Sequence, residues 1–159
     1  MKLLFVCTHN RCRSILAEAI CNHYSAGAIE AFSAGSAPSG IVHPLAIHNL
    51  KQRGISTNGL KSESWEEYSA QSLGAVVTLC DSAAGEACPL WMGNTLKAHW
   101  GMPDPSAING TDEQIATAFA SVITVLEQRV HALAALVAGG LEMKKALNAV
   151  VTKYPAPTF

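Results

Sequence analysis

Residues 3–14 read Leu-Leu-Phe-Val-Cys-Thr-His-Asn-Arg-Cys-Arg-Ser: an apolar run, then a cysteine, five residues, an arginine and a serine. A short apolar run that ends at a loop is typical of a buried parallel strand. Apolar residues at helical spacing resume after Arg13. The stretch therefore predicts a strand, a tight loop and a helix, and the N–H groups of such a loop and helix form a concave site for a tetrahedral oxyanion.

Two side chains of the loop are suited to chemistry on that anion. Arg13 stands at the start of the helix, where its planar guanidinium can bind two anion oxygens. Cys7 lies at the base of the same positive field, which favours the nucleophilic thiolate. The alternative is a buried structural cysteine beside a solvated arginine. The residues predicted to bind the oxyanion are Thr8, His9, Asn10, Arg11, Cys12, Arg13 and Ser14.

The composition is that of one globular domain. The chain has 159 residues, of which 49% are hydrophobic and 14% are charged. A chain of this size buries roughly 70% of its unfolded surface, so a large core is expected. The formal net charge of −1 gives no reason to expect nucleic acid or a membrane as a partner. We expect no stretch long and apolar enough to span a bilayer, and no signal peptide.

The five cysteines indicate thiol chemistry in a reducing compartment. Without a signal peptide, the protein is predicted to be cytoplasmic. The cysteine spacings do not match a zinc site, because Cys7 and Cys12 lack a Cys-x2-Cys partner and seven residues separate Cys80 from Cys88. No metal and no bound cofactor are predicted.

Strand and helix patterns alternate along the chain, which predicts a parallel sheet with right-handed crossovers. A capping box at Thr111 and Gln114 opens a long helix that ends at Gly139-Gly140, and a short helix can follow. No internal repeat is recognised. The predicted strands are residues 2–6, 29–33, 75–79 and 97–100, and the first two predicted helices are residues 13–24 and 44–53.

Cys7 and Cys80 each follow a predicted strand. Ligands of an open parallel sheet bind beyond the carboxyl ends of its strands, so the two thiols face one crevice if the strands are neighbours. A fully helical segment would separate the Cα atoms of Cys80 and Cys88 by about 12 Å, whereas a disulfide needs roughly 4.4–6.8 Å. A bond between them requires the segment to bend or unwind, which Gly85 and Pro89 favour. The alternative is two unrelated cysteines.

Asp104 lies between two prolines, which fix the backbone and hold its carboxyl group out in a rigid loop. Such an acid above an anion site could protonate a leaving oxygen. Asp-Pro is also a common turn without a catalytic role. Glu18, one turn beyond Ser14, is interpreted as a solvated helix residue in preference to a partner of the loop.

Several short motifs occur together in a pattern found in one protein family. They are Val6 to Ser14, Ser33-Ala34-Gly35, Thr78-Leu79-Cys80, Cys88-Pro89, His99-Trp100-Gly101 and Asp104-Pro105. These motifs resemble the low-molecular-weight protein tyrosine phosphatase family and, within it, the thioredoxin-coupled arsenate reductases. The resemblance implies a single α/β domain with a four-stranded parallel sheet flanked by helices on both faces. Residues 1–138 would form the catalytic domain and residues 139–159 a C-terminal extension.

The resemblance also implies roles for the loop and its acid. Cys7 is the nucleophile. Arg13 and the loop amides hold the oxyanion, Ser14 forms a hydrogen bond with the thiolate, and Asp104 is the general acid.

In the reductase branch, two further cysteines complete a relay. Cys80 attacks Cys7, arsenite leaves with two electrons, and Cys88 then moves the disulfide to the pair Cys80–Cys88, where thioredoxin reduces it. The sequence departs from the family pattern in two places: the Cys80–Cys88 gap is one residue longer than in the best-known reductases, and His9 replaces a more usual glycine. Cys12 matches a family cysteine that either packs or forms a protective bond with Cys7.

Two alternative functions stay open. A low-molecular-weight phosphatase would hydrolyse phosphomonoesters through a Cys7 phosphoenzyme, and a non-enzymatic sensor would bind an oxyanion or react through its thiols. Ser106-Ala107 stand where tyrosine phosphatases of the family usually carry aromatic residues, which favours the reductase. The reductant also stays open, because mycothiol- and glutaredoxin-coupled relatives exist.

Potassium binding is a further open question. Some relatives bind potassium near the loop through residues that match Asn10, Glu18 and Ser33. Lys61 could take the place of the ion.

Overall fold

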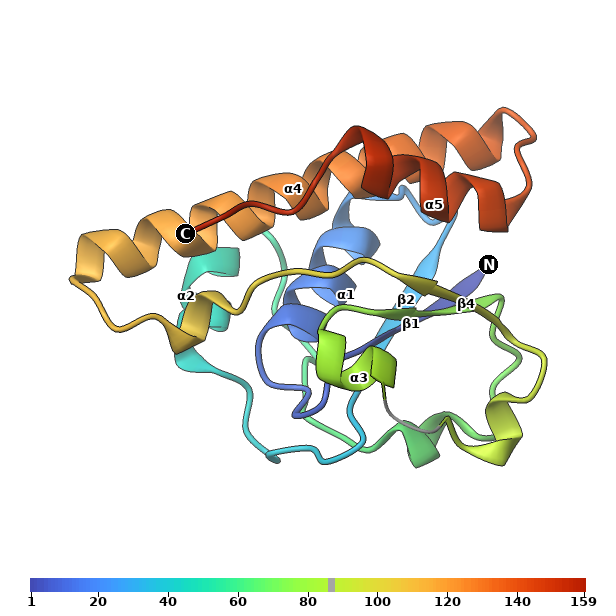
Figure 1. Ribbon diagram of the computed structural model, residues 1–159, viewed down its shortest axis with the longest axis horizontal. Coiled ribbons are helices and arrows are strands. Elements are labelled where there is room, and N and C mark those ends of the chain that lie inside the picture. Colours follow the sequence, from blue (N-terminus) through green and yellow to red (C-terminus); the bar gives the residue numbers. More distant parts are fainter. Residues whose placement is uncertain (86–87) are drawn as a thin grey trace.

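The structure is a computed structural model that describes residues 1–85 and 88–159 (Figure 1). Its strands are β1 (Lys2–Val6), β2 (Glu30–Ala34), β3 (Ala75–Thr78) and β4 (Leu96–His99). They form one parallel sheet in the order β2-β1-β3-β4. The four-stranded parallel sheet is thus confirmed, with strand ends about one residue from the sequence-based boundaries.

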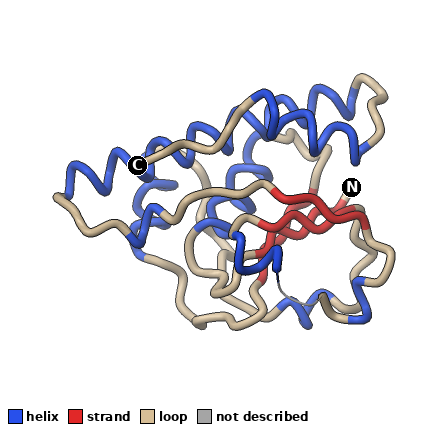
Figure 2. The backbone as a smooth tube through the Cα atoms, viewed as in Figure 1, coloured by secondary structure: helices blue, strands red, loops and turns tan. Residues whose placement is uncertain are grey.

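Helices cover both faces of this sheet, as Figures 1 and 2 show. The long helices are α1 (Arg13–Tyr24), α2 (Pro44–Gln52), α4 (Asp112–Ala138) and α5 (Met143–Lys153), and the short ones are α3 (Asp81–Gly85), η1 (Trp65–Tyr68), η2 (Leu90–Met92) and η3 (Pro105–Ala107). α1 packs against β1, β2 and α4, and α5 packs against α4 and β4. α3 follows β3 directly and packs against it on the other side.

The alternation of side chains along β1 divides the core into two clusters. Phe5 packs in the larger cluster with α1, α4 and α5. Leu4 and Val6 point to the opposite face and pack in a smaller cluster, under α3, η1 and η2. Cys7 and Cys80 both belong to this smaller cluster. Both faces of the sheet are therefore buried, which explains the continuous apolar run that opens the chain.

The segment after α4 folds back onto the larger cluster. The indole Nε1 of Trp100 donates to the carbonyl of Leu147 at 3.1 Å. The buried guanidinium of Arg129 donates to the carbonyls of Trp100 at 2.7 Å and Tyr154 at 2.9 Å. Burial lowers the pKa of Arg129 to about 10. The division at residue 138 stays a prediction, and in the structure the two parts share one core.

α4 contradicts the expectation that no stretch of the chain is long and apolar enough to span a bilayer. Within the described residues it is the one helix that is long and apolar enough, by length and composition, to cross a membrane. Phe119, Val122 and Leu126 on one face of it are fully buried, and the charged Arg129 is buried beside them. The apolar residues on this face are those that a helix packed against a core requires.

Gly35 follows β2 at a point where the chain runs directly against the loop after β1. A Cβ atom at Gly35 would lie 2.5 Å from the carbonyl oxygen of Thr8 and 2.8 Å from that of Cys7. The backbone at Gly35 is held in place, because its N–H donates to Glu63 at 3.0 Å and its carbonyl accepts from Trp65 at 3.1 Å. The close approach of the two backbones therefore requires glycine.

We expect Gly35→Ala to lower the free energy of unfolding by about 1–3 kcal/mol, because the added methyl group must displace backbone atoms. Urea unfolding measures the change. The matched control is Gly139→Ala, where the added Cβ would meet its nearest atoms at 3.4 Å and 3.5 Å. An equal loss of stability in both variants would contradict the assignment.

Candidate active site

The loop between β1 and α1 turns its carbonyl groups outward. The carbonyls of Thr8, His9 and Arg11 accept hydrogen bonds from N–H groups of the segment 37–43, at 2.9 Å, 3.0 Å and 2.9 Å. A trans peptide unit directs its C=O and N–H to opposite sides. The N–H groups that follow these carbonyls, at residues 9, 10 and 12, therefore point to the concave side, where the N-terminus of α1 also opens.

This concave side is a small cavity of about 80 Å³. A water molecule occupies roughly 30 Å³ of liquid, so the cavity has the size of a small inorganic anion. Of the seven residues predicted to bind the oxyanion, five line this cavity together with Cys7 and the predicted acid Asp104, whereas Asn10 and Ser14 are buried behind it. Its lining consists of Cys7, Thr8, His9, Arg11, Cys12, Arg13, Asp104 and Ser106.

A series of hydrogen bonds behind the loop determines which hydrogen atom points at the sulfur of Cys7. The N–H of Glu63 donates to Asn10 Oδ1 at 2.8 Å, so the amide nitrogen of Asn10 faces Ser14 and donates to its Oγ at 2.8 Å. The Ser14 hydroxyl hydrogen is then free to point at Cys7 Sγ, 2.9 Å away. Asn10 is fully buried and has a φ of 44°, a region that asparagine tolerates. This arrangement lets the Ser14 hydroxyl donate a hydrogen bond to the sulfur of Cys7.

Arg13 links the loop to the segment that carries Asp104. Its Nη1 donates to the carbonyl of Met102 at 3.0 Å, and its Nη2 lies 3.6 Å from Asp104 Oδ2. The other carboxylate oxygen, Oδ1, accepts hydrogen bonds from the N–H and the hydroxyl of Ser106, at 2.9 Å and 2.6 Å. The carboxyl group is thereby held at the cavity by contacts from both sides.

Sequence reasoning missed this role of Ser106, which it considered only as a position without an aromatic ring. The order Asp104-Pro105-Ser106 is a local signal that could have revealed it, because aspartate is favoured as the residue that caps a following turn. The support that Glu63 gives to Asn10 was also missed. It joins residues 53 positions apart, so no local pattern could indicate it.

Cys80 lies just beyond the end of β3, the strand next to β1. Its Sγ is 3.7 Å from the hydroxyl of Thr8 and accepts a hydrogen bond from the N–H of Ala83 at 3.3 Å. Cys7 and Cys80 are each only 4% exposed and pack in the same buried cluster. The structure therefore places both thiols in one cluster at the carboxyl ends of neighbouring strands, with Cys7 lining the cavity and Cys80 not in its lining.

The other three cysteines lie in different surroundings, and all five thiols are free. Cys88 is exposed. Cys12 is buried at the cavity, and burial, reinforced by Asp104, raises the pKa of its thiol. Burial raises the pKa of Cys21 to about 12. Cys12 and Cys21 are therefore held as thiols, and neither is activated as a nucleophile.

The structure contradicts the interpretation of Glu18 as a solvated helix residue. It accepts a hydrogen bond from the Ser33 hydroxyl at 2.5 Å, and burial raises its pKa to about 7. Lys61 Nζ lies 3.2 Å from Glu63 Oε2, and the Tyr68 hydroxyl donates to the other oxygen of Glu63. Among the described residues, no group of three His, Cys, Asp or Glu side chains is placed to hold a metal ion.

Comparison with known proteins identifies the family. A family model described as low molecular weight phosphotyrosine protein phosphatase matches residues 2–147. The chain belongs to this family. The match of the low-molecular-weight phosphatase model ends inside α5, so residues 148–159 lie beyond it.

Several relatives of this chain are named arsenate reductases. An arsenate reductase of Halalkalibacterium halodurans is 34% identical over 132 residues, 83% of this chain and 94% of the relative. A glutaredoxin arsenate reductase of Synechocystis sp. is 32% identical over 134 residues, 84% of this chain and 96% of the relative. A solved arsenate reductase in the phosphate binding state has a TM-score of 0.69 at 32% identity, over 84% of this chain and 96% of that one.

Ser14→Ala is expected to slow alkylation of Cys7 by iodoacetamide at neutral pH by about tenfold or more, because a hydrogen bond to a charged group contributes about 1.5–3 kcal/mol. Mass spectrometry of the modified peptides separates Cys7 from the exposed Cys88. Ser25→Ala is the matched control, since that buried hydroxyl donates to the carbonyl of Ile29. If both variants react as fast as the parent, the Ser14 hydroxyl does not activate Cys7.

Glu18 is expected to make stability depend on pH. Its pKa is about 7 in the folded chain against an ordinary value of 4.5. The folded state therefore binds this proton more tightly, and the stabilisation present below the ordinary pKa is lost as the pH rises through the folded value. Relative to Glu18→Gln, the parent should lose roughly 2–3 kcal/mol of unfolding free energy between about pH 5 and about pH 8.

Urea unfolding at each pH measures this difference. Glu113→Gln, an exposed acid in the first turn of α4, is the control and should follow the parent curve. A constant gap between the parent and Glu18→Gln at every pH would show that Glu18 titrates normally.

Proposed function

We propose that the chain is an arsenate reductase that works through a relay of three thiols, Cys7, Cys80 and Cys88. The proposal is carried by the packing of Cys7 and Cys80 in one buried cluster beside an anion-sized cavity. Hydrolysis of a phosphoester needs only the first of these thiols. The relatives named arsenate reductase, which are more than 30% identical over most of this chain, support the proposal.

In the first step, the Cys7 thiolate attacks the arsenic atom of arsenate. An As–S bond forms, and one oxygen leaves as water after it takes up a proton from Asp104. The inward N–H groups of the loop and the Arg13 guanidinium hold the remaining oxygens. The position of both side chains at the cavity supports these roles.

In the second step, the Cys80 thiolate attacks the sulfur of Cys7. A Cys7–Cys80 disulfide forms, the As–S bond breaks, and its electron pair stays on arsenic, which leaves as arsenite. Arsenic thus gains the two electrons that the two sulfurs lose. The N–H of Ala83 donates to the Cys80 sulfur, and the Thr8 hydroxyl lies 3.7 Å from it, so both contacts help to position the attacking atom.

In the third step, the Cys88 thiolate attacks Cys80, so the disulfide moves to Cys80–Cys88 and Cys7 is released as a thiolate. Cys88 is exposed whereas Cys80 is buried, so this exchange carries the disulfide to the surface. We propose thioredoxin as the reductant, because a dithiol protein reduces an intramolecular disulfide by exchange. The cytoplasm is the compartment that keeps such a reductant reduced.

Slow hydrolysis of phosphomonoesters is a second proposed activity, favoured by the family itself and by Cys7, Arg13 and Asp104 at one cavity. The described lining of that cavity contains no Phe, Tyr or Trp, and Ser106 stands beside the acid. A phosphotyrosine ring would therefore find no aromatic surface on which to stack. The small cavity suits an inorganic anion better.

Arsenate turnover with thioredoxin, thioredoxin reductase and NADPH tests the proposal. The parent should consume NADPH only when arsenate is present. Cys80→Ser and Cys88→Ser should reduce this turnover to the uncatalysed background, because each removes one link of the relay. Cys21→Ala, which changes a buried cysteine outside the cavity, is the control and should keep the parent activity.

Hydrolysis of an aryl phosphate separates the two activities. Cys80→Ser and Cys88→Ser should keep the parent rate there, since only Cys7 forms the covalent intermediate. A parallel assay with glutathione, glutaredoxin, glutathione reductase and NADPH tests the other reductant. Fast hydrolysis without arsenate-dependent NADPH consumption in either reductant system would make the chain a phosphatase.

A further inference from the structure

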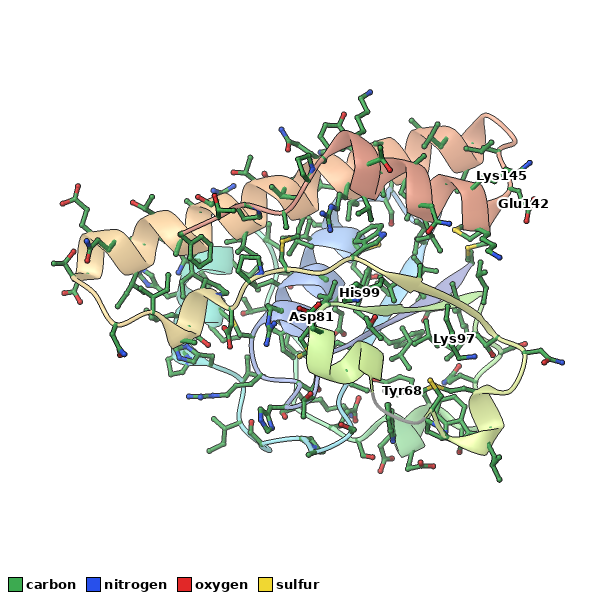
Figure 3. The ribbon with its side chains drawn as sticks, in the orientation of Figure 1. Tyr68, Asp81, Lys97, His99, Glu142 and Lys145 are labelled. Carbon is green, nitrogen blue, oxygen red and sulfur yellow. The ribbon has the colours of Figure 1, made fainter. Side chains whose placement is uncertain are left out.

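A cluster of side chains outside the cavity ties α3 to the end of β4. His99, the last residue of β4, places Nε2 3.0 Å from Asp81 Oδ1 and Nδ1 2.8 Å from Thr78 Oγ1. Asp81 is the first residue of α3 and directly follows Cys80. Figure 3 shows Asp81 and His99 next to each other, one at the start of α3 and the other on β4.

The backbone leaves room for this contact. A Cβ atom at Gly101 would lie 2.9 Å from the Nε2 of His99, so the glycine lets the imidazole ring lie where it meets Asp81. The side chains of His99 and Asp81 are 40% and 97% exposed. An exposed pair contributes little to the stability of a whole fold, but a short helix has few other contacts, so the pair weighs more in its local equilibrium.

Both protonation forms of the imidazole preserve the contact. A carboxylate only accepts hydrogen bonds, so the Nε2 of His99 carries a hydrogen toward Asp81 in either form. The Thr78 hydroxyl can donate to Nδ1, which leaves the ring neutral. When it donates to the carbonyl of Ala98, 3.4 Å away, Nδ1 carries a hydrogen as well, and the contact is an ion pair.

α3 is the element that the relay has to alter. The Sγ of Cys80 is buried and accepts the N–H of Ala83 across the first turn of α3, whereas Cys88 is exposed. A Cys80–Cys88 disulfide takes that sulfur out of its place in the turn. α3 has only five residues, far fewer than a helix needs to be stable alone. The contacts that hold α3 to the sheet therefore decide how readily the Cys80 sulfur leaves its position in the first turn.

We propose that the His99–Asp81 pair is a latch that stabilises the dithiol form of Cys80 and Cys88 and so sets their reduction potential. The latch rests on the proposed thiol relay. His99 is a positioning residue, because it acts on Cys80 through Asp81 and the first turn of α3. The contact is made in the dithiol form and is lost when α3 opens, so removing it shifts the equilibrium toward the disulfide.

A redox titration against reduced and oxidised dithiothreitol tests the latch. Two thiols lose two protons and two electrons to form the disulfide, and the oxidised reagent takes them up. The titration uses the full chain with Cys7→Ser, Cys12→Ser and Cys21→Ser, so that Cys80 can pair only with Cys88. Asp81→Asn and His99→Gln should each favour the disulfide about threefold, which makes the potential about 14 mV more negative.

The double variant Asp81→Asn/His99→Gln should shift the potential no further than either single variant, because the two changes remove one contact. Asp112→Asn is the matched control, since it makes the same change in the first turn of α4, and should leave the potential unchanged. Urea unfolding of each reduced variant should give a midpoint close to that of the parent, because an exposed pair contributes little to global stability.

Potentials equal to the parent value in the single variants, or single shifts that add in the double variant, would overturn the latch. If the parent forms no Cys80–Cys88 disulfide under full oxidation, the relay itself fails. That result differs from a failure of the latch alone, in which the disulfide forms at an unchanged potential.

Discussion

The outward orientation of the carbonyl groups at residues 8, 9 and 11 is the constraint on which the site depends. These carbonyls stay outward because N–H groups of the segment 37–43 bind them. That segment lies in place because β1 and β2 pair in register up to Val6 and Ala34, which puts Gly35 against the loop. The register of two strands therefore fixes the direction of the N–H groups that would meet an anion.

The order of the strands explains why two thiols meet at one edge. β1 lies inside the sheet, between β2 and β3. The connection after β1 runs to one side of it, and the connection after β2 crosses to β3 on the other side. A crevice opens at the carboxyl end of the strand where the direction changes. Cys7 follows β1 and Cys80 follows β3, so both residues lie at the edge of the sheet where this crevice opens. Their packing in one cluster follows from the topology and needs no contact special to cysteine.

The sequence revealed those features that local patterns encode. The loop from Cys7 to Ser14, the parallel strands and the capping box at Thr111 each depend on neighbouring residues, and the structure contains all three. Features that depend on distant residues were missed. Glu18 was interpreted as a solvated helix residue, yet Ser33, 15 residues away, binds its carboxylate in a partly buried site. Helical periodicity cannot show how deeply a residue at the edge of the apolar face is covered.

The proposed thiol relay would place opposite mechanical demands on Cys7 and Cys80. Cys7 has to be rigid, because it must point at an anion held by fixed N–H groups, and the buried chain from Asn10 through Ser14 holds it. Cys80 has to move, because its sulfur must react first with an inner and then with an outer partner. It directly precedes α3, a helix of only five residues that the exposed His99–Asp81 pair ties to β4. Segments that move in function come from the low-stability end of a fold, and the short α3 gives the buried Cys80 such a neighbour, whereas the buried hydrogen bonds behind the loop hold Cys7 in place.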